Sequence, residues 1–359
     1  ENILTNSRGG AVGIVCPTRL VYIPNNGRLN AEVARYIFAG DSVGQPMRMG
    51  EIVRLGKNAT PSDANNSRYF VLGDPAMRLA LPRYGVRLTA INGQSVSADN
   101  LPVFRARETV TFEGVVCDAD GNRLTDFNGT LAATLYDSEQ SVVTHSYGDG
   151  IEYTFTERPN KLALCVDKVE GGAFSLRVTI PSEIVASYDN YSPSLLTMYA
   201  YDETSRREAL GNNSDFYIYG YDSDEVTDTD GPEIIVLGLN SETFADGSDV
   251  NESPLVMATI SDASGVNFSQ GGIGHSMVLT LDGSTTYSDL TSYYTPQLCE
   301  SGTLGTLAFP LSELSPGRHT LRLKVWDVFN NSSQREISFN VVSGLRPSLT
   351  DVTVTPNPA

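Results

Sequence analysis

The sequence predicts a multidomain, mainly β protein that begins with a short α/β segment. Three observations predict this fold class: the chain length, the abundance of turn residues, and the recurrence of short apolar stretches between turns. The 359 residues are enough for two or three domains. The 32 Gly and 18 Pro interrupt strands at turns, and the 17 Tyr suit half-buried strands. With 40% hydrophobic residues, each domain has enough apolar side chains for a packed core.

Residues 1–85 carry the pattern of an α/β segment. A continuous apolar run at 11–16 is bounded by glycine, which is typical of a strand buried on both faces in a parallel sheet. Apolar residues at helical spacing then predict helices over 30–39 and 45–58. A second short strand is expected at 69–72. The order strand, helix, helix, strand is that of the last part of an α/β domain.

From residue 86 onward the pattern changes to short strands separated by turn signals. Two β-sandwich, immunoglobulin-like domains are therefore predicted, at 86–225 and 226–345. Between them lies a run of acidic residues at 222–230 without an intervening base, which is typical of a solvated linker. Residues 346–359 are expected to begin a further, truncated β module.

The charge balance and the cysteine spacing exclude several kinds of function. The net charge of −18 argues against nucleic acid as a partner, because phosphate backbones are bound by clustered Lys and Arg. No apolar stretch approaches the roughly 20 residues that cross a bilayer, so no transmembrane segment is predicted. Four Cys and three His lack the spacing of a zinc site. Cys117 and Cys165 fall in one domain, where they form either a disulfide or two buried thiols.

Acidic clusters make calcium the one cofactor that the sequence suggests. Calcium is held by several convergent oxygens, and six aspartates at turn and linker positions offer them. These candidate ligands are Asp118, Asp120, Asp222, Asp224, Asp228 and Asp230. The same clusters are also typical of ordinary turns and linkers, and none has the spacing of a 12-residue helical-hand loop. Both interpretations therefore remain open.

The N-terminal segment resembles the end of the gingipain-type cysteine peptidase domain. The likeness rests on Gly9–Ile14, on Thr18–Tyr22 and above all on Leu72–Leu79, which contains the sequence Gly-Asp-Pro. The β domains resemble the C-terminal half of the type IX secretion sortases of that family. This second likeness is clearest at Ser261–Asn267 and Lys324–Ser333.

The resemblance implies that residues 1–85 are the C-terminal remnant of a caspase-like α/β peptidase domain. It further implies a hydrolase at the outer membrane and cell surface of Bacteroidetes, on the extracellular face. Such a cysteine endopeptidase cleaves the sorting domains of secreted cargo proteins and acts together with secretion-system components. In this family the nucleophilic Cys and its His partner precede the strand at 11–16. We therefore expect no catalytic residue in this chain, which would serve as inactive structural and docking support.

The sequence also permits other interpretations of the function. The chain is alternatively a non-catalytic surface protein with a structural or adhesive role. A carbohydrate-binding sandwich needs an exposed aromatic platform, whereas the single tryptophan, Trp326, is expected to pack between two sheets. A nucleophilic pair of Cys165 and His145 is disfavoured, because turn residues on both sides of His145 predict an exposed loop.

Overall fold

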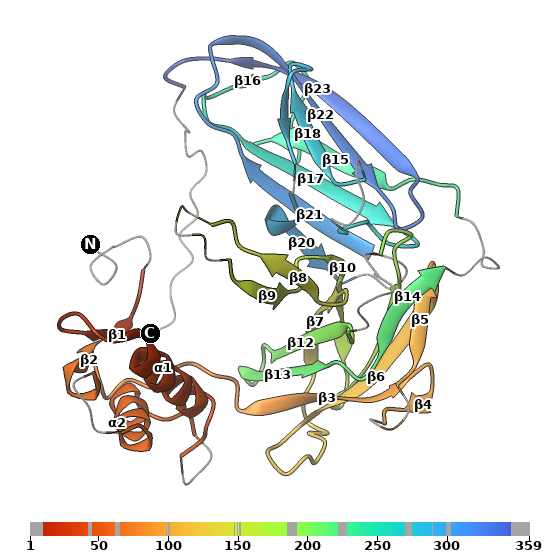
Figure 1. The fold of residues 1–359 in the computed structure, drawn as a ribbon. Helices are drawn as coiled ribbons and strands as arrows, with labels where there is room; N and C mark the ends of the chain where they lie inside the picture. Colours follow the sequence, from red (N-terminus) through yellow and green to blue (C-terminus); the bar gives the residue numbers. More distant parts are fainter. Residues whose placement is uncertain are drawn as a thin grey trace, which may run out of the picture. The chain divides into compact units, whose positions relative to one another are not determined.

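The computed structural model of the chain describes thirteen ranges of residues and divides into two compact units. The described residues are 10–41, 45–61, 65–97, 99, 101–146, 148, 150, 152–184, 192–221, 228–269, 275–288, 290–298 and 303–345. The first unit comprises residues 1–85 with the short segments 117–122 and 207–210, and the second comprises the rest (Figure 1). The further β module expected at 346–359 lies outside the described residues.

The predicted order strand, helix, helix, strand is confirmed in the first unit. Its elements are β1 (Gly13–Pro17), α1 (Ile23–Ile37), α2 (Met49–Ala59), the 3-10 turn η1 (Asn66–Arg68) and β2 (Tyr69–Gly73). β1 and β2 pair antiparallel, from Gly13 opposite Gly73 to Pro17 opposite Tyr69. The expectation that the first strand is buried on both faces of a parallel sheet is wrong for the described structure. β1 is half-buried throughout, because β2 is the one strand that pairs with it among the described residues.

Helix α1 begins well before its predicted start at Asn30. Asn25, Asn26 and Gly27 are weak helix formers, so the pattern suggested a later N-terminus. In the structure Pro24 occupies the first turn, where its missing N–H is not needed and its fixed φ suits a helix. Further along, a Cβ at Gly56 of α2 would lie 2.8 Å from Cγ2 of Val33, so this glycine allows the two helices to approach closely.

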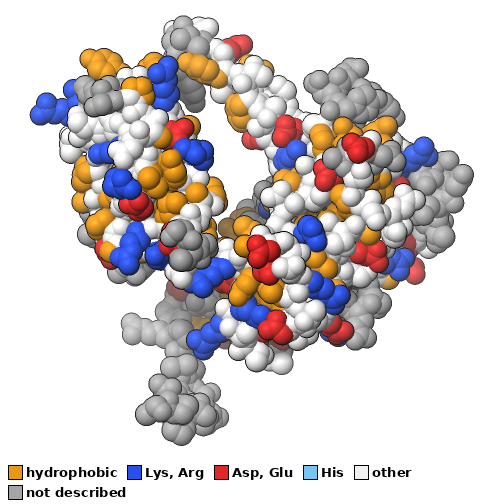
Figure 2. Space-filling model, turned by 90° about the horizontal axis from the view of Figure 1, so that it is seen from below, with side chains coloured by type: hydrophobic (Ala, Val, Ile, Leu, Met, Phe, Trp, Pro, Cys, Tyr) orange, Lys and Arg blue, Asp and Glu red, His pale blue; other side chains and the backbone are white. Residues whose placement is uncertain are grey.

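The first unit exposes many large apolar side chains (Figure 2). Seven of them have exposed fractions between 37% and 92%: Val12, Leu20, Tyr22, Ile23, Phe38, Phe70 and Leu72. Within residues 10–85 the structure describes few buried apolar residues, namely Leu29, Ile52, Val53 and Tyr69. Contiguous exposed apolar surface in a folded protein usually marks a site that another polypeptide covers.

The first β domain is built on one eight-stranded sheet of order β10-β7-β12-β13-β3-β6-β11, with β4 paired to β3. Two separate ribbons pair β5 with β14 and β8 with β9. The bounds are β3 (Tyr84–Ile91), β4 (Gln94–Ser95), β5 (Val103–Ala106), β6 (Thr109–Cys117), β7 (Gly129–Tyr136), β8 (Gln140–Val143), β9 (Thr154–Glu157), β10 (Lys161–Val169), β11 (Ala173–Thr179), β12 (Leu195–Asp202), β13 (Arg207–Asn213) and β14 (Tyr217–Tyr221).

Alternation along β6 places every second side chain in the core of this domain. Phe112 is fully buried there, with its ring centroid 5.4 Å from that of Phe216. The turn between β3 and β4 uses Asn92 and Gly93, both with positive φ (50° and 73°), as a tight hairpin requires.

The second β domain is a sandwich of two sheets, of order β15-β17-β21-β20 and β16-β23-β22-β18-β19. The bounds are β15 (Glu233–Leu239), β16 (Asp249–Val250), β17 (Leu255–Asp262), β18 (Val278–Leu281), β19 (Thr285–Tyr287), η2 (Leu290–Tyr293), β20 (Tyr294–Gln297), β21 (Thr303–Pro310), β22 (Gly317–Trp326) and β23 (Ser332–Val341). Inward side chains of both sheets, such as Ile260 and Leu323, form one apolar core.

The expectation that Trp326 packs between the two sheets is wrong. On β22 the buried positions are Leu321, Leu323 and Val325, so Trp326 falls on the opposite face and is half-buried. Its ring lies 4.2 Å from Nζ of Lys324 and 4.3 Å from the ring of His275, measured to the centroids.

The predicted fold class, a multidomain and mainly β protein with an α/β segment at its N-terminal end, is confirmed by these elements. The domain boundaries at residues 85 and 225 remain predictions. In the described part of the chain, no helix is long and apolar enough to cross a membrane.

Candidate functional site

Of the six predicted calcium ligands, Asp118 and Asp120 lie in the turn that follows β6. Oδ1 of Asp118 accepts the backbone N–H groups of Asp120 at 3.0 Å and Asn122 at 2.9 Å. These bonds, led by the one from Asn122, hold the pKa of Asp118 below its ordinary value. The carboxylate therefore serves the turn itself, and Asp120 is exposed beside it.

The other four predicted ligands belong to the linker between the β domains. Asp222 and Asp224 lie outside the described residues. Asp230 is exposed and donates its N–H to Oδ1 of Asp228 at 3.0 Å. Among the predicted residues that the structure describes, Asp228 is the one that lies together with other acidic groups.

Asp228, Asp262 and Asp327 form an acidic cluster in which one carboxylate oxygen of each lies within 4.8 Å of the others. Asp262 is the last residue of β17, and Asp327 directly follows β22. The two strands belong to different sheets of the second β domain. The loop after β17 is joined to the end of β22 by a hydrogen bond from the N–H of Asn267 to the carbonyl of Trp326, at 2.9 Å.

Hydrogen bonds fix each carboxylate of the cluster. Oδ1 of Asp262 accepts the N–H groups of Ser264 at 2.9 Å and Gly265 at 2.7 Å. In Asp327, Oδ1 accepts the N–H of Asn331 at 2.7 Å and Oδ2 accepts its side-chain amide, also at 2.7 Å. The hydroxyl of Ser264 donates to Oδ2 of Asp228. Such turns place an aspartate at the end of a strand with its carboxylate directed by the following backbone.

The three carboxyl groups have different proton affinities. Burial, followed by the nearby charges of Asp327 and Asp228, raises the pKa of Asp262 to about 6. Burial also raises the pKa of Asp327, which is fully buried. The hydrogen bond from Ser264 lowers the pKa of Asp228. At neutral pH the cluster therefore holds negative charge in a poorly solvated place, which either a proton or a cation relieves.

The donor set is compatible with a hard divalent cation but supplies only part of its coordination. Calcium takes six to eight oxygens, whereas the cluster offers three carboxylates whose oxygens are mostly engaged by N–H groups. Within the described part of the chain, no donor is paired with Oδ2 of Asp262. Sequence reasoning found Asp228 but missed Asp262 and Asp327. The signal that marks both is an aspartate at the end of a strand, followed by Ser-Gly or Asn-Asn two to four residues later.

The cysteines and histidines form no nucleophilic pair among the described residues. His145 is exposed, as predicted. Cys117 and Cys165 are both free thiols in the structure, so they do not form a disulfide. Burial, followed by the charge of Asp167, raises the pKa of Cys165 to about 12, which makes it a poor nucleophile. Cys299 lies outside the described residues.

The other two histidines contact carboxylates. Nδ1 of His319 lies 2.7 Å from Oδ2 of Asp282, and its Nε2 lies 2.8 Å from the carbonyl of Ser315. Burial lowers the pKa of His319, but these two contacts outweigh it and the pKa is raised. Nδ1 of His275 contacts Oε1 of Glu183. Both histidines therefore have structural partners.

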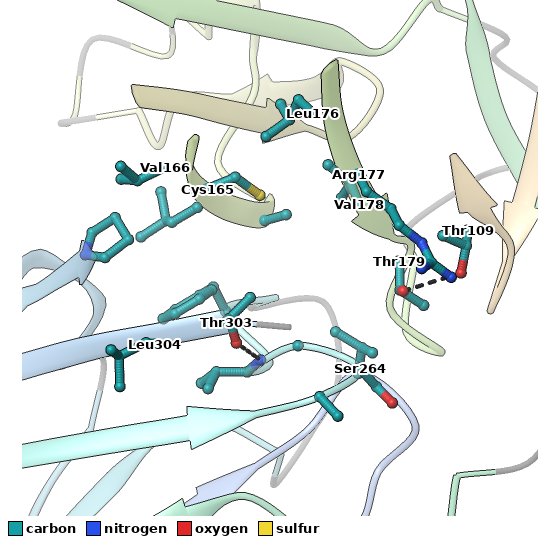
Figure 3. Close-up of a pocket in the computed structure, with 18 of the residues that line it drawn as sticks. Thr109, Cys165, Val166, Leu176, Arg177, Val178, Thr179, Ser264, Thr303 and Leu304 are labelled. Atoms are coloured by element: carbon teal, nitrogen blue, oxygen red, sulfur yellow. Dashed lines mark hydrogen bonds between the residues drawn. The ribbon is translucent and has the colours of Figure 1, made fainter. Parts of the chain in front are cut away.

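A cavity of about 750 Å³ lies within the second unit, next to the acidic cluster. It is lined by residues of β10, β11, β20 and β21 together with Asp228 and the loop that follows β17. Figure 3 shows Cys165 and Val166 of β10, Arg177 and Thr179 of β11, and Thr303 of β21 around this space. Its lining is about equally polar and apolar, and it contains no pair of residues equipped for nucleophilic catalysis.

Comparison with known proteins finds a family likeness for the N-terminal segment. Residues 1–80 match the sequence model of peptidase family C25. The chain is similar to a protein whose solved structure is that of dimeric latent PorU from Porphyromonas gingivalis, with 32% identity and a TM-score of 0.46. That match covers 90% of this chain and 30% of PorU, so the chain spans less than a third of the solved relative.

Other solved structures are only remotely similar. The endo-β-1,4-mannanase of Thermotoga petrophila matches with 13% identity and a TM-score of 0.21, over 33% of this chain and 21% of that one. The fibronectin(III)-like modules of Clostridium thermocellum CbhA match with 10% identity and a TM-score of 0.19, over 74% of this chain and 100% of that one. Neither likeness supports a conclusion about fold or function. No curated protein matches the chain.

Proposed function

We propose that residues 1–80 are a segment of a family C25 peptidase domain and that the chain is the C-terminal, mainly β region of a type IX secretion sortase. In this proposal the β domains support the peptidase domain and dock its protein substrates at the cell surface. The family match at residues 1–80 is the observation that carries the proposal. The 32% identity with PorU across 90% of the chain supports the choice of this member of the family.

The exposed apolar side chains of the first unit also support a place in a larger domain. Val12, Phe70 and Leu72 lie on or beside the two strands, and Ile23 and Phe38 lie at the two ends of α1. Their burial would stabilise a domain by about 25 cal/mol per Å² of apolar surface, which the segment does not gain by itself. We propose that the sequence preceding Glu1 supplies the covering elements together with the catalytic Cys and His.

An activity-directed thiol probe tests the peptidase part of this proposal. The chain and a longer product that includes the preceding sequence are each treated with a peptide that carries a thiol-reactive group. We expect labelling of the longer product alone, at a cysteine outside this chain, because Cys165 has a raised pKa and no histidine partner among the described residues. Labelling of Cys165 in this chain would contradict the proposal, and labelling of neither product would favour the structural or adhesive alternative.

The sortase role needs a separate test in cells. A strain whose longer protein lacks residues 86–345 is expected to accumulate secreted proteins with uncleaved sorting domains. Protease added to intact cells is expected to digest the wild-type protein if it lies on the extracellular face. Normal processing of the sorting domains in the deletion strain would contradict a supporting role for the β domains.

For calcium, we propose that Asp228 is a ligand together with Asp262 and Asp327, in place of the other five predicted residues. The close approach of the three carboxylates supports this set. The turn bonds of Asp118 argue against the first pair of candidates.

A further inference from the structure

The cavity of the second unit runs along the edges of two strands. It is lined by five consecutive residues of β10, Ala163–Asp167, and by four consecutive residues of β11, Leu176–Thr179. Successive side chains of a strand point to opposite faces of its sheet. A cavity bordered by consecutive residues therefore lies along the edge of the strand, where backbone N–H and C=O groups are presented. We call this space, between the free edges of β10 and β11, the edge groove.

β10 and β11 are the two end strands of the eight-stranded sheet. β10 pairs with β7 on one side, and β11 pairs with β6 on one side. No strand in the described part of the chain pairs with the other side of either. A tight turn joins the two, with reciprocal bonds of 2.9 Å and 3.0 Å between Glu170 and Ala173. The edge groove opens beyond this turn.

The hydrogen bonds at both ends of β11 show which of its backbone groups face the edge groove. Val116 donates its N–H to the carbonyl of Gly172, and Ile180 donates its N–H to the carbonyl of Glu108, both at 2.9 Å. The register between β6 and β11 has no shift, and antiparallel strands bond through alternate residues. The even-numbered residues of β11 therefore bond to β6. The N–H and C=O groups of Arg177 and Thr179 point to the groove.

The opposite wall directs a guest strand towards β11. Pro296 and Gln297 of β20 line the edge groove there. Pro296 has no N–H to offer, and proline on an edge strand prevents pairing. Arg177 is exposed, and it forms no ion pair with another described residue. Asp167 and Asp228 also line the edge groove, so an acidic guest residue is favourable only directly opposite Arg177, as a cross-strand pair.

We propose that the edge groove binds an extended segment of another polypeptide, which adds a strand to β11. The segment has alternating β-branched side chains and an acidic residue opposite Arg177. This mode of recognition takes its affinity from main-chain hydrogen bonds and its selectivity from alternate side chains. If the β domains dock protein substrates, the edge groove is where an extended part of the substrate binds. The inference does not depend on that docking role, because it rests on the open strand edges.

The test uses the full 359-residue chain and a fluorescein-labelled decapeptide in which Val alternates with Thr and one central Thr is replaced by Glu. Fluorescence anisotropy is expected to show saturable binding. The same peptide with proline at two central positions is expected not to bind. Arg177→Ala keeps the N–H and removes the charge, so binding should weaken about two- to fivefold. Arg177→Pro removes the groove-facing N–H and should weaken binding at least tenfold beyond Arg177→Ala.

Hydrogen exchange in the wild-type chain tests the proposal even if Arg177→Pro does not fold. In the wild-type chain, bound peptide is expected to slow exchange of the amides of Arg177 and Thr179. The amides of Leu176 and Val178, which already bond to β6, should be unchanged. Absence of binding, or equal protection of all four amides, would overturn the proposal. So would concentration-dependent dimerisation that protects the same amides, because the edge would then belong to a second copy of this chain.

Discussion

Phe112→Ala is expected to destabilise the first β domain by about 3–5 kcal/mol. Phe112 has no exposed surface, and its ring centroid lies 5.4 Å from that of Phe216. The ring of Phe216 in turn lies 6.2 Å from Phe104, so the three rings fill the interior beside β6. Alanine removes a ring from this cluster and leaves a cavity that the surrounding sheet can close only in part. Urea unfolding, with hydrogen exchange of the β6 amides to assign the transition, measures the loss.

The matched control makes the same substitution on the surface of the same domain. Phe155 lies on β9 and is 45% exposed, so Phe155→Ala is expected to cost less than about 1 kcal/mol. A cost for Phe112→Ala within about 1 kcal/mol of the control would show that the aromatic cluster is not the core of this domain.

Strand positions were predictable where a simple alternation extends over a whole element. Residues 109–113 alternate between polar and apolar, and β6 occupies Thr109–Cys117. An Asn-Gly pair between two strands is typical of a tight turn, and Asn92 and Gly93 both have positive φ. The size and apolarity of Trp326 indicate an interior position, whereas its position along β22 determines which face of the sheet it occupies. The parity of Leu321 and Leu323 along the same strand places it outward.

The start of α1 and the composition of the acidic cluster depended on information that local patterns lack. Tertiary contacts stabilise a helical turn through Asn25–Gly27, whose intrinsic propensity is low. Asp262 and Asp327 come together because β17 and β22 end at the same end of the sandwich. Where the two strands end depends on strand pairing between distant segments of the chain. Residue spacing in the linker therefore revealed Asp228 but not its neighbours.

Asp262→Asn is expected to stabilise the second β domain by about 1–3 kcal/mol at pH 7.5 in buffer with EDTA. The pKa of Asp262 is raised to about 6 in the folded chain, so the protonated form is favoured by folding. Its contribution to stability is present below the unfolded pKa and is lost as pH rises through about 6. Asparagine keeps an acceptor for the N–H groups of Ser264 and Gly265 and carries no charge. Thermal unfolding between pH 5 and pH 8 measures the difference.

The comparison between the two chains separates the effect of Asp262 from that of His319. The pKa of His319 is raised by Ser315 and Asp282, so its stabilising contribution is also lost as pH rises above its ordinary value. His319 is present in both chains, and its effect cancels in their difference. A difference that does not grow between pH 5 and pH 8 would contradict the assignment to Asp262.

Calcium reverses the order of the two chains if the acidic cluster holds the ion. Added Ca²⁺ at about 1,000 times its dissociation constant would stabilise the wild-type domain by about 4.1 kcal/mol, whereas Asp262→Asn would gain little because one ligand is lost. The wild-type chain would then be the more stable at pH 7.5. If Ca²⁺ leaves both unfolding curves unchanged, the calcium proposal is wrong. The buried negative charge of Asp228, Asp262 and Asp327 would then be relieved by protons alone, and the sandwich would be most stable in mild acid.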